Sequence, residues 1–202
     1  MLAVLAVSTA LAEDEATPFE LTLHAGYRIG GELDDDGEED LVYEVEESNA
    51  QRVTFNIVAS PTTQWEVLFA RQRTLLGADG MRGVDSRIDV DVEYLHFGGT
   101  YLLSDGDARP FIVLTAGLAR FEPRDSDVGA ENYVSASIGG GVQLRTKKRL
   151  GVRLEARAFA TLVDDKGGLF CRSGPEGGAC LVAVEGDAVV QWEAGAGIVY
   201  RF

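Results

Sequence analysis

The sequence predicts an all-β fold, a closed eight-stranded antiparallel β-barrel that crosses a membrane. Eight segments alternate apolar and polar residues with the period of two that β-strands show. The connections between these segments alternate between long and short. No segment after residue 12 approaches the run of about eighteen apolar residues that a membrane helix needs. About ten alternating residues are enough for a strand to cross a bilayer, so the pattern favours a barrel.

The first four predicted strands cover about 19–31, 50–60 and 64–74, and a segment that begins near residue 87. On the fourth strand the apolar face carries Val90, Val92 and Tyr94, whereas the polar face carries Asp91 and Glu93. Gly98 and Gly99 indicate a β-bulge in this strand, because unbroken alternation would turn the following tyrosine to the polar face.

The last four predicted strands cover about 110–121, 132–145 and 150–162, and the final segment that ends at Phe202. In the final segment Trp192, Tyr200 and Phe202 share one face, with Glu193 on the other. Aromatic residues near strand ends on an apolar face are typical of the girdles at membrane interfaces.

The connections place four long loops at one rim of the barrel and three short turns at the other. The long polar connections are 33–49, 75–86, 122–131 and 163–187, and the short ones are 61–63, 104–109 and 146–149. A soluble β-sandwich has no reason to keep such a rhythm, and no second domain is evident.

The amino-acid composition disfavours one class of function. The 202 residues include 33 acidic and 18 basic side chains, for a formal net charge of −15. Nucleic-acid binding is disfavoured, because it needs a basic surface.

The first twelve residues predict a secretory signal peptide. Residues 1–12 are nearly all apolar and end in Ala10-Leu11-Ala12, a small-residue cleavage motif, before an acidic stretch. The basic stretch that usually opens such a peptide is missing, which indicates either a start assigned too late or a truncated chain. The alternative is a buried N-terminal helix.

The only two cysteines, Cys171 and Cys180, flank a Gly- and Pro-rich segment. In an exported protein this pattern predicts a local disulfide. A metal site is the alternative, but it lacks nearby histidines, and we expect no metal and no cofactor.

Four segments carry a resemblance to a known family. They are 94–101 (YLHFGGTY) before a short turn, 109–113 (RPFIV), 139–142 (GGGV) and 199–202 (VYRF). With them the chain resembles the small outer-membrane β-barrel proteins of Gram-negative bacteria, the OmpA-, OmpX- and OmpW-like eight-stranded group. The resemblance is architectural and spans the mature chain.

The resemblance implies an outer-membrane barrel over residues 19–202, with both termini in the periplasm and a short periplasmic segment at 13–18. It also implies that the barrel assembly machinery recognises the final aromatic strand through Tyr200 and Phe202. We expect a monomer in contact with outer-membrane lipids and lipopolysaccharide, and no nucleic-acid partner.

The polar faces of the predicted strands carry many charged residues. The predicted lumen charge network comprises His24, Arg28, Arg52, Glu66, Asp91, Glu93, Arg153, Glu155, Arg157 and Glu193, together with Glu20. An eight-stranded barrel is just wide enough for side chains to fill it, which favours a salt-bridged plug over a narrow ion path.

The function expected from these features is a non-catalytic structural or surface-interaction role. Barrel enzymes need a histidine with a suitable partner, whereas His24 is expected in the lumen and His96 at the membrane interface. The alternatives are a channel for small solutes or hydrophobic molecules, a lipid-modifying barrel enzyme and a soluble lipocalin-like barrel.

The first long loop contains an acidic run at 34–40. Clustered carboxylates attract Ca²⁺, but the run does not match an EF-hand, so a solvated loop is the main expectation and a divalent-cation site the alternative.

Overall fold

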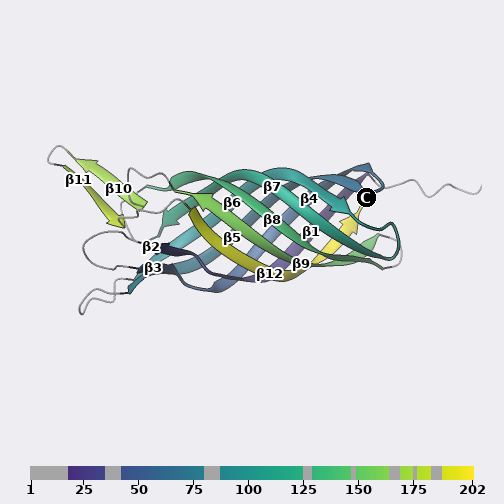
Figure 1. Cartoon of the computed structure of the whole chain (residues 1–202), viewed down its shortest axis with the longest axis horizontal. Coiled ribbons are helices and arrows are strands. Elements are labelled where there is room, and N and C mark those ends of the chain that lie inside the picture. Colours follow the sequence, from purple (N-terminus) through teal and green to yellow (C-terminus); the bar gives the residue numbers. More distant parts are fainter. Residues whose placement is uncertain are drawn as a thin grey trace, which may run out of the picture.

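A computed structural model shows a closed barrel of eight antiparallel strands, which confirms the predicted fold class (Figure 1). The structure describes residues 18–34, 42–79, 87–124, 129–146, 149–163, 169–174, 177–182 and 188–202. The barrel strands are β1 (Phe19–Ile29), β4 (Ser48–Ser60), β5 (Thr63–Asp79), β6 (Arg87–Leu102), β7 (Ala108–Pro123), β8 (Glu131–Arg145), β9 (Leu150–Leu162) and β12 (Ala188–Arg201). The ring runs in the order β5-β4-β1-β12-β9-β8-β7-β6 and closes through the pairing of β5 with β6.

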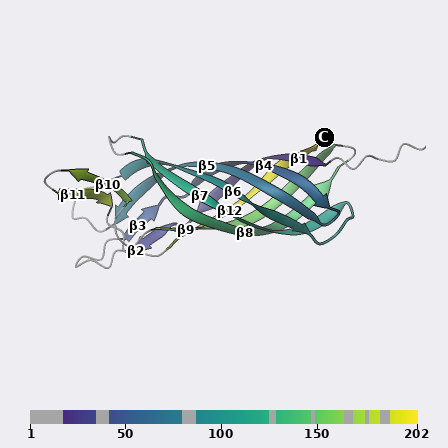
Figure 2. The ribbon, with the colours of Figure 1, turned by 90° about the horizontal axis from the view of Figure 1, so that it is seen from above.

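The two rims of the barrel differ, as the connection lengths predict. Short turns join β4 to β5, β6 to β7 and β8 to β9 at one rim, which we call the short-turn end. The barrel begins and ends at this rim, because the N–H of Phe202 donates a hydrogen bond to the carbonyl oxygen of Phe19 at 3.2 Å. We call the other rim the long-loop end (Figure 2).

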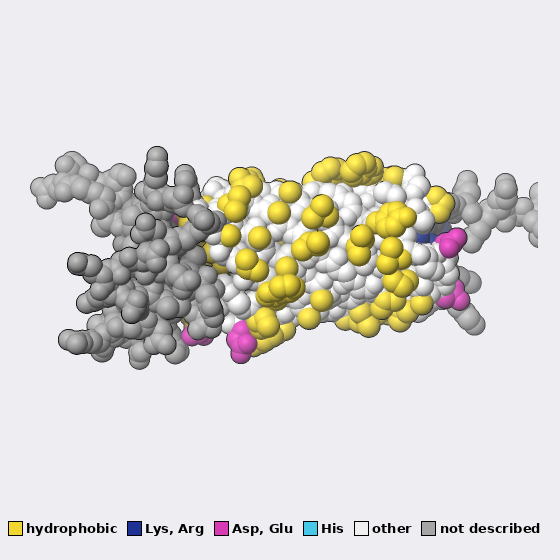
Figure 3. Space-filling view, viewed as in Figure 1, with side chains coloured by type: hydrophobic (Ala, Val, Ile, Leu, Met, Phe, Trp, Pro, Cys, Tyr) yellow, Lys and Arg dark blue, Asp and Glu magenta, His cyan; other side chains and the backbone are white. Residues whose placement is uncertain are grey.

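The outer wall is apolar over much of its height. Figure 3 shows hydrophobic side chains spread over the barrel between its two ends. Near the short-turn end the outward aromatic rings contact one another: Trp65 stacks on Phe97 with centroids 5.6 Å apart, and Tyr200 lies edge-on to Phe202 at 5.3 Å. Burying a wall of this kind in hydrocarbon removes the cost of exposing it to water.

The predicted bulge at Gly98 and Gly99 is wrong. The pairing of β6 with both β5 and β7 runs through these residues without a register shift. Gly98 has a different role, because a Cβ atom there would lie 2.1 Å from the carbonyl oxygen of Leu114. Glycine therefore allows β6 and β7 to approach closely.

Two hairpins stand at the long-loop end within segments predicted as loops. β2 (Glu32–Asp34) pairs with β3 (Val42–Val45), and β3 extends the wall by pairing with the last residues of β5. β10 (Leu169–Gly174) and β11 (Gly177–Val182) form a separate two-stranded sheet, seen beyond the barrel in Figure 1.

Several predictions fall outside the described residues. These are the signal peptide at 1–12, residues 13–17 of the predicted periplasmic segment and residues 35–40 of the acidic run. The backbone register places Cys171 opposite Cys180, but their side chains are not described. Within the described ranges no helix is long and apolar enough to cross a membrane.

Candidate functional site: the charged lumen

The inward faces of the barrel strands carry the candidate site. Each strand turns alternate residues inward, so polar residues at period two line one enclosed space. Nine of the predicted network residues are buried there: Glu20, His24, Arg28, Arg52, Glu66, Arg153, Glu155, Arg157 and Glu193.

Seven of these residues form one continuous set of ion pairs. Arg28 pairs with Glu193 at 2.5 Å, and Glu193 also pairs with Arg52 at 3.2 Å. Arg52 continues the set to Glu155 at 3.1 Å. Charges in this space need such partners, because an unpaired buried charge is costly.

The set of ion pairs ends at Glu66, whose side chain contacts arginines on the opposite wall of the lumen. Its Oε1 lies 2.7 Å from Nη2 of Arg157, and its Oε2 lies 3.2 Å from Nη2 of Arg153. Glu155 binds the Nε atoms of the same two arginines at 2.7 Å each. β5, which carries Glu66, and β9, which carries the arginines, lie on opposite sides of the ring. The ion pairs therefore span the full width of the barrel.

Two of the guanidinium groups in the lumen lie over aromatic rings. The guanidinium carbon of Arg28 lies 4.9 Å from the ring centroid of Tyr94 and 4.6 Å from that of Phe159. Arg153 lies over Phe111 at 3.9 Å. Cation–π contacts of this kind fix the side chains in addition to their ion pairs.

A second polar layer lies toward the short-turn end. Glu20 accepts hydrogen bonds from Gln64 at 3.1 Å and from Gln143 at 3.0 Å, and its other oxygen pairs with Arg201 at 3.1 Å. Arg109 donates to the carbonyl oxygen of Pro61 at 2.7 Å. Glu20 thus links β1 to β5, β8 and β12, and Arg109 joins β7 to the turn between β4 and β5.

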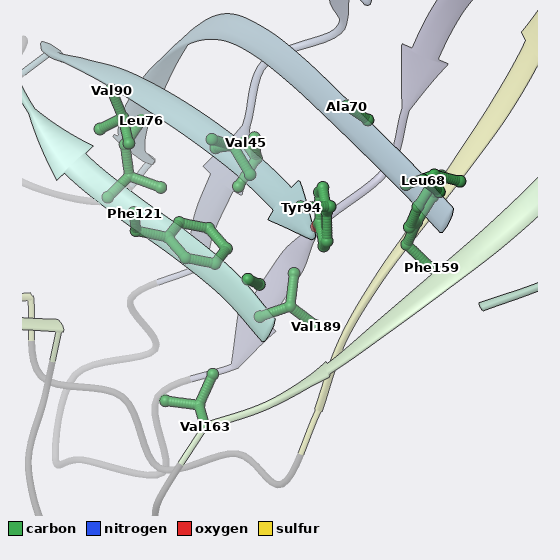
Figure 4. Packing of buried hydrophobic residues seen from close by; sticks show 12 residues of the cluster. Val45, Leu68, Ala70, Leu76, Val90, Tyr94, Phe121, Phe159, Val163 and Val189 are labelled. Carbon is green, nitrogen blue, oxygen red and sulfur yellow. The ribbon is translucent and has the colours of Figure 1, made fainter. Parts of the chain in front are cut away.

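Apolar side chains fill the lumen toward the long-loop end. Figure 4 shows Leu76, Val90 and Phe121 from neighbouring strands facing one another, with Tyr94 and Phe159 in the same cluster. The hydroxyl of Tyr94 donates a hydrogen bond across the lumen to Gln191 at 2.8 Å. The lumen thus changes from apolar to charged along its axis.

The structure corrects the predicted positions of Asp91 and Glu93. Both lie on the outer face of β6, where Asp91 pairs with Arg71 at 2.6 Å and Glu93 with the same arginine at 3.6 Å. The inward face of β6 carries Val90, Val92 and Tyr94 instead. The prediction is wrong because it assigned every polar face to the lumen. β6 extends past the apolar part of the outer wall, which we call the apolar belt, and polar residues can face outward there.

The structure also corrects the predicted positions of His96 and Tyr94. Both were expected toward the membrane, but both are 1% exposed and lie in the lumen. Nδ1 of His96 lies 3.2 Å from the hydroxyl of Thr115, and its ring packs on Phe159. Leu95, Phe97 and Tyr101 form the exposed apolar face of the same strand, and unbroken alternation from that face is the sequence signal that could have placed them.

Within the described part of the chain, no three His, Cys, Asp or Glu side chains gather in a way that could hold a metal ion. His24 contacts Arg52 at 3.2 Å, and the hydroxyl of Thr115 lies 2.6 Å from that of Ser137. These groups support the fold of the lumen by hydrogen bonding.

No protein family model and no curated protein sequence matches the chain. Solved structures do match it. Neisserial surface protein A is 11% identical, with a TM-score of 0.60 over 92% of this chain and 97% of that one. The outer membrane protein OprG from Pseudomonas aeruginosa is 12% identical, with a TM-score of 0.56 over 92% and 97%.

A third match is the outer membrane protein AlkL, which is 12% identical with a TM-score of 0.52 over 100% of this chain and 97% of that one. At such identities the likeness shows the fold. The chain has the fold of outer-membrane β-barrel proteins, which supports the predicted outer-membrane location.

Proposed function

We propose that the protein is an integral outer-membrane barrel with a closed lumen and a non-catalytic structural or surface-interaction role. The observation that carries the proposal is the ion pairing of Glu66 with Arg153 and Arg157 across the barrel. All three side chains are at most 1% exposed, so the lumen is filled at this level. An eight-stranded barrel filled in this way leaves no room for solute passage.

The same proposal includes the orientation and partners of the barrel. The short-turn end faces the periplasm, as in barrels with short turns on that side, and the long loops face outward. Tyr200 and Phe202 lie at the short-turn end, where the assembly machinery would meet them. The protein acts as a monomer among outer-membrane lipids.

A planar-bilayer recording of the full chain tests the closed lumen. We expect no stepwise current from the wild type, and currents from a Glu66→Ala, Arg157→Ala double variant that lacks the bridge. Glu122→Ala is the matched control, because its pair with Arg120 lies outside the barrel with both side chains about half exposed. Heat-dependent gel mobility verifies that each sample is folded. Stepwise currents from the wild type would contradict the proposal.

A second candidate function is the capture of small hydrophobic molecules from outside. The apolar character of the lumen toward the long-loop end, where Leu76, Val90 and Phe121 lie, favours it. The test is displacement of a fluorescent apolar probe from the folded wild type and from Leu68→Asn. Equal probe binding by both proteins would remove this candidate.

A further inference from the structure

The outer surface of β5, β6 and β7 changes abruptly from apolar to charged. Phe69, Leu95 and Leu118 lie side by side in the register of the three strands, and each is 44–58% exposed. The next outward residues toward the long-loop end are Arg71 on β5, Glu93 on β6 and Arg120 on β7. Three strands therefore mark one boundary of the apolar belt.

Beyond this boundary lies a group of alternating charges that we call the collar. It consists of Arg71 and Arg73 on β5, Asp89, Asp91 and Glu93 on β6, and Arg120, Glu122 and Arg124 on β7 and its end. Among the described residues, β9 and β12 do not continue the collar. Toward the long-loop end of β9 and β12, the outward residues Leu162, Val190 and Trp192 remain apolar and exposed.

Three arginines of the collar surround one carboxylate. Asp91 lies 2.6 Å from Nη2 of Arg71, 3.7 Å from Nε of Arg73 and 3.9 Å from Nε of Arg124. The last two distances are longer than hydrogen bonds. The side chains of Arg73 and Arg124 are 61% and 45% exposed, so their guanidinium groups retain donors that Asp91 does not use.

Stability alone does not account for this arrangement. Exposed ion pairs contribute about 0–1 kcal/mol each, and long pairs sit at the low end of that range. A planar guanidinium group is suited to bind phosphate oxygens in pairs. Arginines directly above exposed apolar side chains combine a site for phosphate with a surface for acyl chains.

We propose that the collar binds the phosphate groups of a phosphorylated glycolipid in the outer leaflet, while the row of Phe69, Leu95 and Leu118 contacts its acyl chains. The inference rests on the proposed orientation, with the long-loop end outside the cell. Arg73 and Arg124 supply the main phosphate donors, and both lie within 4 Å of the same carboxylate, Asp91.

The experiment measures the affinity of the folded full-length protein for lipopolysaccharide in detergent micelles. Binding to the folded state raises the temperature at which the folded gel band is lost, and a titration of this midpoint gives an apparent Kd. The proteins are the wild type, an Arg73→Gln, Arg124→Gln variant and an Arg145→Gln control. Arg145 is an exposed arginine at the short-turn end.

We expect the double variant to bind at least about tenfold more weakly than the wild type, because two charge-assisted hydrogen-bonding groups are lost. The control should bind like the wild type, and dephosphorylated lipopolysaccharide should bind weakly to all three. Equal affinity of the double variant and the wild type would overturn the proposal. So would an equal effect of inorganic phosphate, which would indicate a site for free anions.

The single variant Arg73→Gln serves if the double variant does not fold, since it removes only one long ion pair. Its affinity for lipopolysaccharide should be lower than that of the wild type and the control, and an unchanged affinity would overturn the proposal. The bilayer recording is independent of this measurement. A conducting wild type would contradict the closed lumen and leave the proposed lipid site on the collar intact. Unchanged lipid binding by the variants would contradict the lipid site and leave the closed lumen intact.

Discussion

At the residue scale, Glu66 is the position on which the lumen depends most. It is the carboxylate that joins β5 to Arg153 and Arg157 on the opposite wall, and it also accepts a hydrogen bond from Thr100 at 2.9 Å. Both arginines keep Glu155 as a second partner. Removal of Glu66 would therefore leave excess buried positive charge without releasing the arginines to water.

Glu66→Gln should lower the free energy of unfolding by about 3–5 kcal/mol, the usual cost of breaking a buried ion pair by removal of one partner. Urea unfolding in lipid vesicles measures it. Glu122→Gln is the control and should change the free energy by no more than about 1 kcal/mol, because its pair with Arg120 is exposed. Equal losses in the two variants would contradict the assigned role of Glu66.

Gly98 and Gly99 offer a matched pair on one strand. A Cβ atom at Gly98 would lie 2.1 Å from a backbone oxygen, whereas one at Gly99 would meet its nearest atom at 3.4 Å. Gly98→Ala should therefore destabilise the barrel by about 1–3 kcal/mol, as overpacking does. Gly99→Ala should have little effect in the same urea titration. Similar stability of both variants would show that β6 and β7 can separate without cost.

At the element scale, β6 shows that the sequence predicts a strand but not which of its faces lies inside the barrel. Its alternation predicted a strand, and the strand is present over Arg87–Leu102. Alternation does not state which face is inside, so the polar face with Asp91 was assigned to the lumen. The correct assignment depends on how far β6 extends past the apolar belt, which is set by its pairing with β5 and β7.

The sequence does not predict the β2–β3 and β10–β11 hairpins, for a related reason. β2, β3, β10 and β11 have three to six residues each, too few for a clear period of two. Polar and Gly-rich sequences around them are typical of loops. In contrast, most of the lumen residues could be predicted, because β1, β4, β9 and β12 keep strict alternation along their length.

The β10–β11 hairpin is the element in which a disulfide is expected. A two-residue connection follows Gly174, so counting back along the ladder places Cys171 and Cys180 at a pair that exchanges no backbone hydrogen bonds. Cα atoms of such pairs are about 4.5 Å apart, within the range of disulfides. An isolated hairpin is marginally stable in water, so this bond would stabilise it.

Mass spectrometry after alkylation tests the disulfide in protein isolated from the cell envelope without reductant. We expect no alkylated cysteine before reduction and two afterwards. The Cys171→Ser, Cys180→Ser variant controls for background labelling and should keep the barrel folded, because the hairpin forms its own sheet. Alkylation of both cysteines before reduction would contradict the prediction.

At the scale of the whole molecule, the orientation in the membrane can be measured directly. In a background with both native cysteines replaced by serine, Gly129→Cys and Leu103→Cys mark opposite ends of the barrel. Position 129 is exposed, and a Cβ atom added there would meet no atom within 4 Å. Leu103 is 60% exposed in the turn between β6 and β7.

A thiol reagent that does not cross membranes should label Gly129→Cys in intact cells and should label Leu103→Cys only after lysis. The reason is that the long-loop end is expected outside the cell and the short-turn end in the periplasm. Labelling in the reverse pattern would show that the barrel is inverted and would remove the basis of the proposed lipid site.

The ion pairs across the lumen also constrain the order of assembly. Glu66 and Arg157 are 91 positions apart in the sequence and reach each other from opposite walls. In any open, partly formed sheet, Glu66 would face lipid or water without its arginine partners, and Arg157 would keep only Glu155 on its own strand. A half-built barrel would therefore be unstable in the bilayer. The internal charges should thus make insertion cooperative, because β12 supplies Glu193, the partner of Arg28 on the first strand β1.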